Sequence, residues 1–135
     1  MLNRLNGKMV WVTAACLIFV AGWLMGQQSS RNQKSIIHAV AWTAKEDASD
    51  AALAQFKQST ADLVDAIPGL NKAWVGPLRQ PLTLGDNTYT HGLIFEFGDL
   101  QSREAYPQHP SRPSWIEGFG EVRSGRPVVF DVIGE

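Results

Sequence analysis

Hydrophobic and polar positions divide the 135-residue chain into an uncharged N-terminal run and a longer patterned part. Residues 9–26 carry no charge, follow two basic residues and give way to polar side chains. A helix of about 18 residues reaches roughly 27 Å, which nearly spans the hydrocarbon core of a bilayer. We therefore expect an N-terminal hydrophobic helix that acts as a signal peptide or a membrane anchor. The predicted organisation is a targeting segment (1–30), a linker (31–35) and one folded domain (36–135).

The folded domain opens with a strand pattern and then a helix pattern. Residues 36–43 are rich in strand formers and apolar on both faces, which is typical of a strand covered on both sides. From residue 50 to residue 67, apolar positions recur at steps of three and four, which predicts an amphipathic helix of about four turns. Asp47 or Ser49 can cap this helix, and Pro68-Gly69 ends it.

The rest of the domain alternates further strand and helix signals. Every second residue from Tyr89 onward shares one face of a strand, Asp99 can cap a short helix, and Ser124-Gly125 can turn the chain. The order β-α-β-β-α-β predicts an α+β, ferredoxin-like fold. The expected elements are strands over 70–75, 89–97 and 127–133, a loop over 78–88, and helical stretches over 100–106 and 115–122.

Composition and charge narrow the possible functions. The net charge is −1 and no run of basic residues is present, so the sequence lacks the electrostatic footprint of a nucleic-acid-binding protein. The one cysteine, Cys16, lies in the N-terminal run, which leaves no thiolate site or disulfide in the domain. Its three histidines form no local ligand pair, and no phosphate loop or nucleophile elbow is present. We therefore expect no metal, haem or other cofactor.

Several short motifs stand in a fixed order along residues 36–133. They are His38 with Val40 and Trp42, Ile67-Pro68-Gly69, Val75-Gly76-Pro77, Tyr89-Thr90-His91, Phe95-Glu96-Phe97, Tyr106 with His109-Pro110, and Val129-Phe130-Asp131. Their order and spacing resemble the stress-responsive A/B barrel domain (Dabb) family. The resemblance implies a ferredoxin-like protomer that pairs through its sheet into a dimeric α/β barrel. Strands that are apolar on both faces agree with this, because a second copy would cover the face that the helices leave bare.

The resemblance also implies a pocket between the sheet and the helices. One relative with a known reaction is a polyketide cyclase, whose motif is Tyr-x-x-His-Pro-x-His, with the final histidine as general base. In this chain the motif corresponds to Tyr106, His109 and Arg112, and the strand histidines are His38 and His91. A guanidinium stays protonated and cannot take up a proton, so Arg112 cannot serve as the general base of the cyclase mechanism.

Each candidate pocket residue has a functional and a structural interpretation. His38 and His91 are either a polar pair that lines a ligand pocket or two hydrogen-bonded core histidines. Tyr106 and His109 are either a catalytic pair or the end of a helix, and Arg112 either binds an acidic ligand or is a solvated loop charge. The tryptophans are most simply core or dimer-contact residues. The candidate pocket residues are His38, Trp42, His91, Tyr106, His109 and Arg112.

Two functions follow as hypotheses. The first is an exported, dimeric module that binds a small apolar or acidic ligand and has no catalysis of its own, either anchored to the membrane through residues 9–26 or secreted after cleavage. The second is a lyase or isomerase similar to polyketide cyclases, with pocket histidines and Tyr106 as acid–base groups.

Overall fold

The computed structural model describes residues 34–134. The predicted signal peptide or anchor, and all but the end of the predicted linker, lie outside the described residues. Among the residues that are described, no helix is long and apolar enough to cross a membrane.

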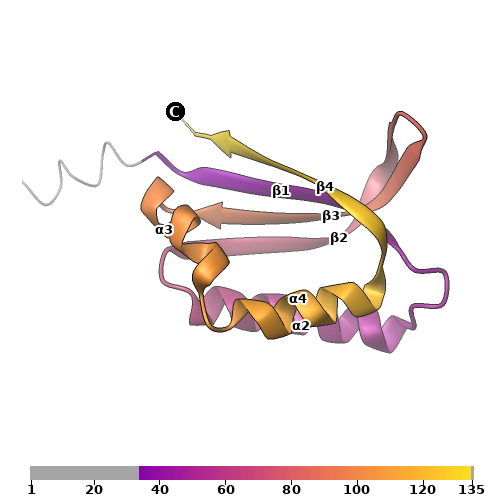
Figure 1. Ribbon diagram of the computed structural model, residues 1–135, viewed down its shortest axis with the longest axis horizontal. Helices are drawn as coiled ribbons and strands as arrows, with labels where there is room; N and C mark the ends of the chain where they lie inside the picture. Colours follow the sequence, from indigo (N-terminus) through magenta and orange to yellow (C-terminus); the bar gives the residue numbers. More distant parts are fainter. Residues whose placement is uncertain (1–33, 135) are drawn as a thin grey trace, which may run out of the picture. The chain divides into compact units, whose positions relative to one another are not determined.

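Four antiparallel strands form one sheet in the order β2-β3-β1-β4, and the helices cover one of its faces (Figure 1). The ferredoxin-like order predicted from the sequence is confirmed, with the second helical region divided by a 3₁₀ turn. In chain order the elements are β1 (Ile36–Ala44), α2 (Asp50–Ala66), β2 (Leu70–Leu84), β3 (Asn87–Phe97), α3 (Leu100–Ala105), η1 (Tyr106–Gln108), α4 (Arg112–Val122) and β4 (Arg123–Ile133).

Helix α2 begins and ends where the sequence predicts. The Ser49 hydroxyl accepts a backbone N–H of the first turn at 3.1 Å, which satisfies one of the donors left free at a helix start. Phe56, Thr60 and Leu63 form its buried face. Gly69 takes a φ of +80°, a left-handed conformation that other residues rarely adopt, and turns the chain into β2.

An aromatic cluster fills the space between the helices and the sheet. Trp42 packs edge-on against Phe56 and Phe119, with ring centroids 5.8 and 5.3 Å apart. The indole N–H of Trp115 donates to the Thr60 hydroxyl at 3.0 Å, which explains why a threonine is tolerated on the buried face of α2. Burial of each such ring contributes roughly 2–3 kcal/mol to stability.

Strand β2 is longer than its sequence pattern indicates. The loop predicted over residues 78–88 is wrong, because β2 continues to Leu84 and the two-residue turn Gly85-Asp86 leads directly into β3. Gly85 takes a φ of +59°, as tight hairpin turns require. Pro81 fits because the ladder between the strands is interrupted just after Pro77.

Strand β4 also starts earlier than predicted. Ser124 pairs with Thr43 of β1, so the predicted turn at Ser124-Gly125 belongs to the strand. A register shift between Ala41 and Thr43 accommodates the change. As a result β4 follows α4 directly, at Arg123.

The sheet face turned away from the helices carries exposed apolar side chains. Trp74, Phe130 and Val132 are 47%, 51% and 50% exposed. They alternate along their strands with side chains that face the core, as the two-sided pattern of the sequence predicts.

Candidate functional site

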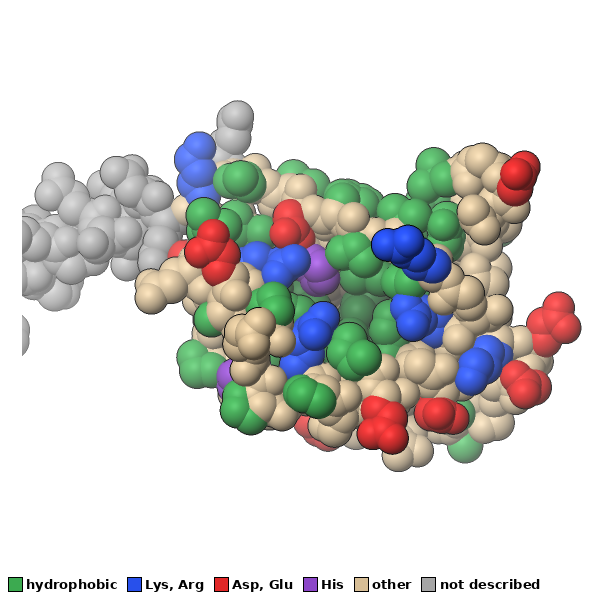
Figure 2. Space-filling view, in the orientation of Figure 1, with side chains coloured by type: hydrophobic (Ala, Val, Ile, Leu, Met, Phe, Trp, Pro, Cys, Tyr) green, Lys and Arg blue, Asp and Glu red, His purple; other side chains and the backbone are tan. Residues whose placement is uncertain are grey.

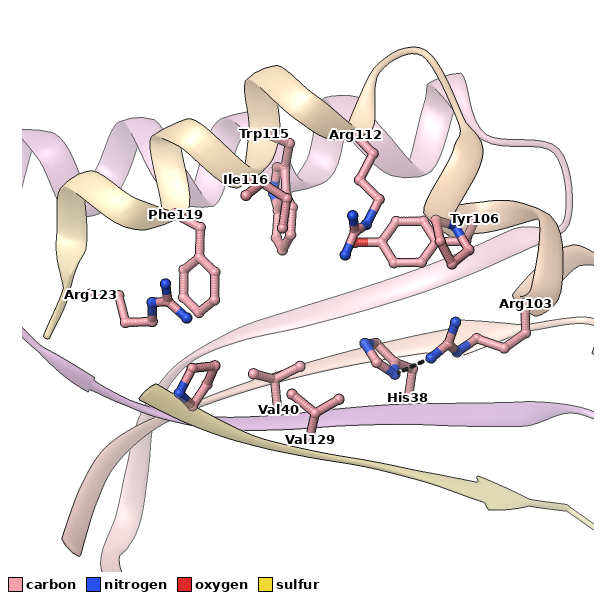
Figure 3. A pocket seen from close by; sticks show the side chains of 12 residues that line it. His38, Val40, Arg103, Tyr106, Arg112, Trp115, Ile116, Phe119, Arg123 and Val129 are labelled. Carbon is pink, nitrogen blue, oxygen red and sulfur yellow. Dashed lines mark hydrogen bonds between the residues drawn. The ribbon is translucent and has the colours of Figure 1, made fainter. Parts of the chain in front are cut away.

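A cavity of about 320 Å³ lies between the sheet and the helices, where β1 and β4 face α3, η1 and α4. Figure 2 shows it as a hollow with apolar side chains and a histidine inside and basic side chains around it. Figure 3 shows the lining side chains, most of which point toward a common space. The polar lining residues are His38, Arg103, Tyr106, Arg112 and Arg123, and the apolar ones include Val40, Trp115, Ile116, Phe119 and Val129.

A hydrogen-bonded network closes one end of the cavity. His38 of β1 pairs across the sheet with Asp131 of β4, which brings Nδ1 to 2.6 Å from Oδ1 of the carboxylate. Arg103 of α3 approaches the same carboxylate with Nε 3.2 Å from Oδ1 and Nη2 3.1 Å from Oδ2. This bidentate fork is the strongest geometry for a guanidinium and a carboxylate.

The carboxylate of Asp131 fixes the tautomer of His38. Burial raises the pKa of Asp131, but hydrogen bonds to His38 and Arg103 outweigh it and hold that pKa below its ordinary value of 3.8. An ionised carboxylate only accepts hydrogen bonds, so His38 Nδ1 carries the proton and donates it. Arg103 Nη2 also lies 3.1 Å from this Nδ1, the contact dashed in Figure 3. Because a protonated Nδ1 cannot accept a hydrogen bond, Nη2 donates to the carboxylate of Asp131 instead.

The other ring nitrogen of His38 is therefore an acceptor. Burial lowers the pKa of His38 below its ordinary value of 6.5, the hydrogen bond to Asp131 opposes this, and Arg103 and Arg112 lower it further. The ring is therefore neutral at pH 7. No described residue bonds Nε2, and Figure 3 shows this nitrogen turned toward Arg112 and Tyr106.

Tyr106 and Arg112 stand opposite His38. The guanidinium carbon of Arg112 lies 5.1 Å from the centroid of the Tyr106 ring, a cation–π geometry. Burial raises the pKa of Tyr106 above 10.0, against the hydrogen bond and charge of Arg112, so its hydroxyl stays protonated. Nε of Arg112 is buried and has no hydrogen-bond partner within the described part of the chain.

Arg123 lies at the far end of the cavity, where α4 meets β4. Its guanidinium carbon is 4.8 Å from the centroid of the Phe119 ring, and its buried Nε also lacks a partner among residues 34–134. Within residues 34–134, salt bridges join only Asp131 to His38 and to Arg103, so Arg112 and Arg123 pair with no carboxylate. The cavity therefore carries an excess of positive charge.

Three of the six predicted pocket residues meet in this cavity: His38, Tyr106 and Arg112. His109 does not line it; its Nδ1 accepts the backbone N–H of Ser111 at 3.3 Å, in a local turn. Arg112 is the first residue of α4 and not a solvated loop charge.

Trp42 and His91 line a second cavity of about 220 Å³, between β1–β3 and α2. The expected histidine pair does not form, because His38 lies opposite Phe95 and His91 opposite Trp42 in the ladder between β1 and β3. Nδ1 of His91 bonds the Thr90 hydroxyl at 2.9 Å, and burial lowers the pKa of His91. The two strand histidines share a sheet face but not a site.

Three residues of the site are not among the predicted pocket residues: Arg103, Arg123 and Asp131. Asp131 is the one that carries a signal, since it ends one of the motifs quoted above and is a charged residue in the otherwise apolar strand pattern of residues 127–133. Nothing in the pattern indicates which residue it faces. Within residues 34–134, no cluster of three or more histidine, cysteine or acidic side chains could hold a metal ion.

Comparison with known proteins agrees with this architecture. The sequence model of the family described as "Stress responsive A/B Barrel Domain" (Dabb) matches residues 36–133, which confirms the resemblance found in the motifs. No curated protein matches the chain.

Solved structures of low sequence identity share the fold. A Dabb family protein from Mesorhizobium loti is 18% identical, with a TM-score of 0.60 over 76% of this chain and 99% of that one. A dimeric ferredoxin-like protein of unknown function from Thermobifida fusca is 17% identical, with a TM-score of 0.59 over 76% and 92%. A hydroxynitrile lyase from Passiflora edulis is 16% identical, with a TM-score of 0.63 over 76% and 94%.

Proposed function

The chain belongs to the stress responsive A/B barrel domain family, and we propose that it is a dimeric module that binds a small molecule in the cavity beside His38. The observation that carries the proposal is the cavity itself, in which His38, Tyr106 and Arg112 converge from three elements over apolar walls. A preformed pocket with a few convergent polar groups is the usual form of a small-molecule site.

Filling the cavity tests this proposal. Ile116 lines the cavity and is 38% exposed, so Ile116→Trp should occupy the space from its rim without straining the core. We expect hydrophobic acids or carbonyl compounds to bind the wild-type chain in a calorimetric titration and to bind this variant at least tenfold more weakly. Leu100→Trp, at an exposed position that does not line the cavity, is the matched control. Equal binding by the wild type and Ile116→Trp would place the ligand elsewhere.

Dimerisation is supported by the exposed apolar sheet face and by dimeric proteins of the same fold. Sedimentation of residues 31–135 at micromolar concentration should give a dimer, and Phe130→Asp should give a monomer because it places a charge in the apolar face. A wild-type monomer under these conditions would contradict the proposal.

Export is proposed from the sequence alone, on the uncharged run of residues 9–26 and the basic residues before it. Alkaline phosphatase, which is active only after export, can be fused behind Glu135. An active fusion is expected, and an intact but inactive fusion would place the domain in the cytoplasm.

One geometric feature favours a second function, acid–base catalysis on a small carbonyl compound. His38 Nε2 is an unprotonated acceptor that Asp131 orients, and the protonated Tyr106 hydroxyl stands across the cavity. The two activities to assay are the release of aldehyde from an aromatic cyanohydrin and the exchange of ketone α-hydrogens in D₂O. Activity that falls at least tenfold in His38→Gln but not in His91→Gln would support catalysis. An inactive wild type would contradict catalysis and leave small-molecule binding as the proposed function.

A further inference from the structure

We infer that the ligand of the His38 cavity is a small 2-hydroxy acid with an apolar side chain, its carboxylate bound by Arg112 and its hydroxyl by His38. This inference rests on the proposed function, that the cavity binds a small molecule. It is carried by the charges at the cavity walls, by the hydrogen bonds that the lining residues lack, and by the size of the space.

The excess of positive charge in the cavity favours an anionic ligand. Arg103 is already neutralised by the bidentate contact to Asp131. Arg112 and Arg123 face no carboxylate within the described residues, and each holds a buried Nε without a partner. A buried donor with no acceptor costs free energy that a bound anion would recover. A carboxylate matches the planar fork of a guanidinium and can engage two of its N–H groups at once.

The end at Arg112 suits the carboxylate better than the end at Arg123. Helix α4 begins at Arg112, so the positive end of its dipole adds to the charge of that side chain. Arg123 caps the other end of α4, where the dipole is negative and offsets a cation. The protonated hydroxyl of Tyr106, against the Arg112 guanidinium, supplies a further donor at the same end.

His38 adds a requirement for a hydroxyl group. Its Nε2 is unprotonated, faces Arg112 and Tyr106, and has no partner among the described residues. An acceptor next to a bound carboxylate needs a donor, and a hydroxyl on the adjacent carbon supplies one within reach of the ring. The pairing of Arg112 with His38 therefore distinguishes a 2-hydroxy acid from a simple acid.

The remaining walls fix the apolar part of the ligand. Trp115, Ile116 and Val129 offer no hydrogen-bonding group to the space that separates Arg112 from Arg123. At about 30 Å³ for each water-sized atom, the 320 Å³ cavity holds roughly ten non-hydrogen atoms. Mandelate has this size, and its phenyl ring fits the apolar walls. Inorganic phosphate has the charge but nothing to cover those walls.

Four probes separate the contributions in a calorimetric titration of the full chain. They are mandelate, phenylacetate, which lacks the hydroxyl, mandelamide, which lacks the charge, and inorganic phosphate. We expect mandelate to bind at least tenfold more tightly than mandelamide, a difference of about 1.4 kcal/mol, and several-fold more tightly than phenylacetate. Phosphate should bind more weakly than either acid.

Paired variants assign each contribution to a residue. Arg112→Gln should weaken both acids at least tenfold, whereas Arg126→Gln, the same change at an exposed position outside the cavity, should change neither. His38→Gln should abolish the preference for mandelate over phenylacetate, and His91→Gln should preserve it. Equal affinity for mandelate and mandelamide would overturn the inference but keep the binding site. If neither these four probes nor the hydrophobic acids and carbonyl compounds of the first titration bound, the proposed function itself would fail.

Discussion

The two cavities between the sheet and the helices lie on one sheet face and have opposite chemistry. The cavity at His38 gathers three arginines and a tyrosine hydroxyl, whereas the cavity at His91 is apolar except for that ring, the Trp42 indole and Lys57. Each contains one strand histidine. The partner across the ladder makes the difference, because His38 faces Asp131 and His91 faces Trp42.

An aromatic wall stands between the two cavities. Trp42 and Phe56 line the apolar cavity, and Phe119 lines the charged one. The rings of Phe56 and Phe119 stack with centroids 5.2 Å apart, and Trp42 meets both edge-on. The contrast between the cavities therefore depends on a wall that a single substitution can open.

Removing the indole of Trp42 should have the largest effect. Trp42 is 1% exposed, and Trp42→Ala should lower the free energy of unfolding by about 3–5 kcal/mol, measured by urea denaturation. The variant should also lose selectivity for acids over neutral aromatic compounds, because the two cavities become continuous. Trp42→Phe, which keeps a ring in the wall, should lose less than half as much stability. If Trp42→Ala kept the wild-type selectivity for acids, the indole would not be what separates the cavities.

The fold could be predicted from the sequence because its elements have clear periods. Helix α2 shows the three- and four-residue spacing of a buried face, and β3 shows strict alternation. The hairpin after Pro77 is not evident from the sequence, because Pro81 and Gly85 are typical of a loop as well as of an interrupted ladder with a tight turn. Turn chemistry at Gly85 alone does not choose between these.

The site could be predicted only in part. The family resemblance predicts that Tyr106 and Arg112 line the pocket. The place of His38 in the first predicted strand adds that residue. The network with Asp131 and Arg103 depends on the register of β1 against β4 and on where α3 lies. Neither is visible in a single sequence, because a slip of one residue would place Asp131 on the other sheet face.

The two histidines should differ in their contribution to stability. His38→Gln removes the donor to Asp131 from a side chain that is 9% exposed, and should cost roughly 1–3 kcal/mol. His91→Gln, at a partly exposed ring whose bond is to its neighbour Thr90, should change stability by less than about 0.5 kcal/mol. Melting curves of the two variants measure this. Equal losses would show that Asp131 does not distinguish the histidines.

The stability of the domain should depend on pH through the same histidine. Burial lowers the pKa of His38, so the unfolded chain binds a proton first as the pH falls below 6.5. The free energy of unfolding should therefore fall from pH 6.5 down to the pKa of the folded state and then level off. His38→Gln should flatten this part of the profile more than His91→Gln. Loss of stability confined to pH below 3.8 would instead indicate carboxylates such as Asp131, whose pKa is lowered.

The smallest change in stability is expected where the effect on binding is largest. Arg112→Gln removes a charge that faces no carboxylate, so without ligand it should leave the free energy of unfolding within about 0.5 kcal/mol of the wild type or raise it. With mandelate at about 100 times Kd, the wild type should gain roughly 2.7 kcal/mol and the variant much less at the same concentration. Arg126→Gln should retain the full gain. A loss of several kcal/mol in ligand-free Arg112→Gln would show that Arg112 holds the fold together, and the cavity could then not be assigned to an anion on the strength of its charge.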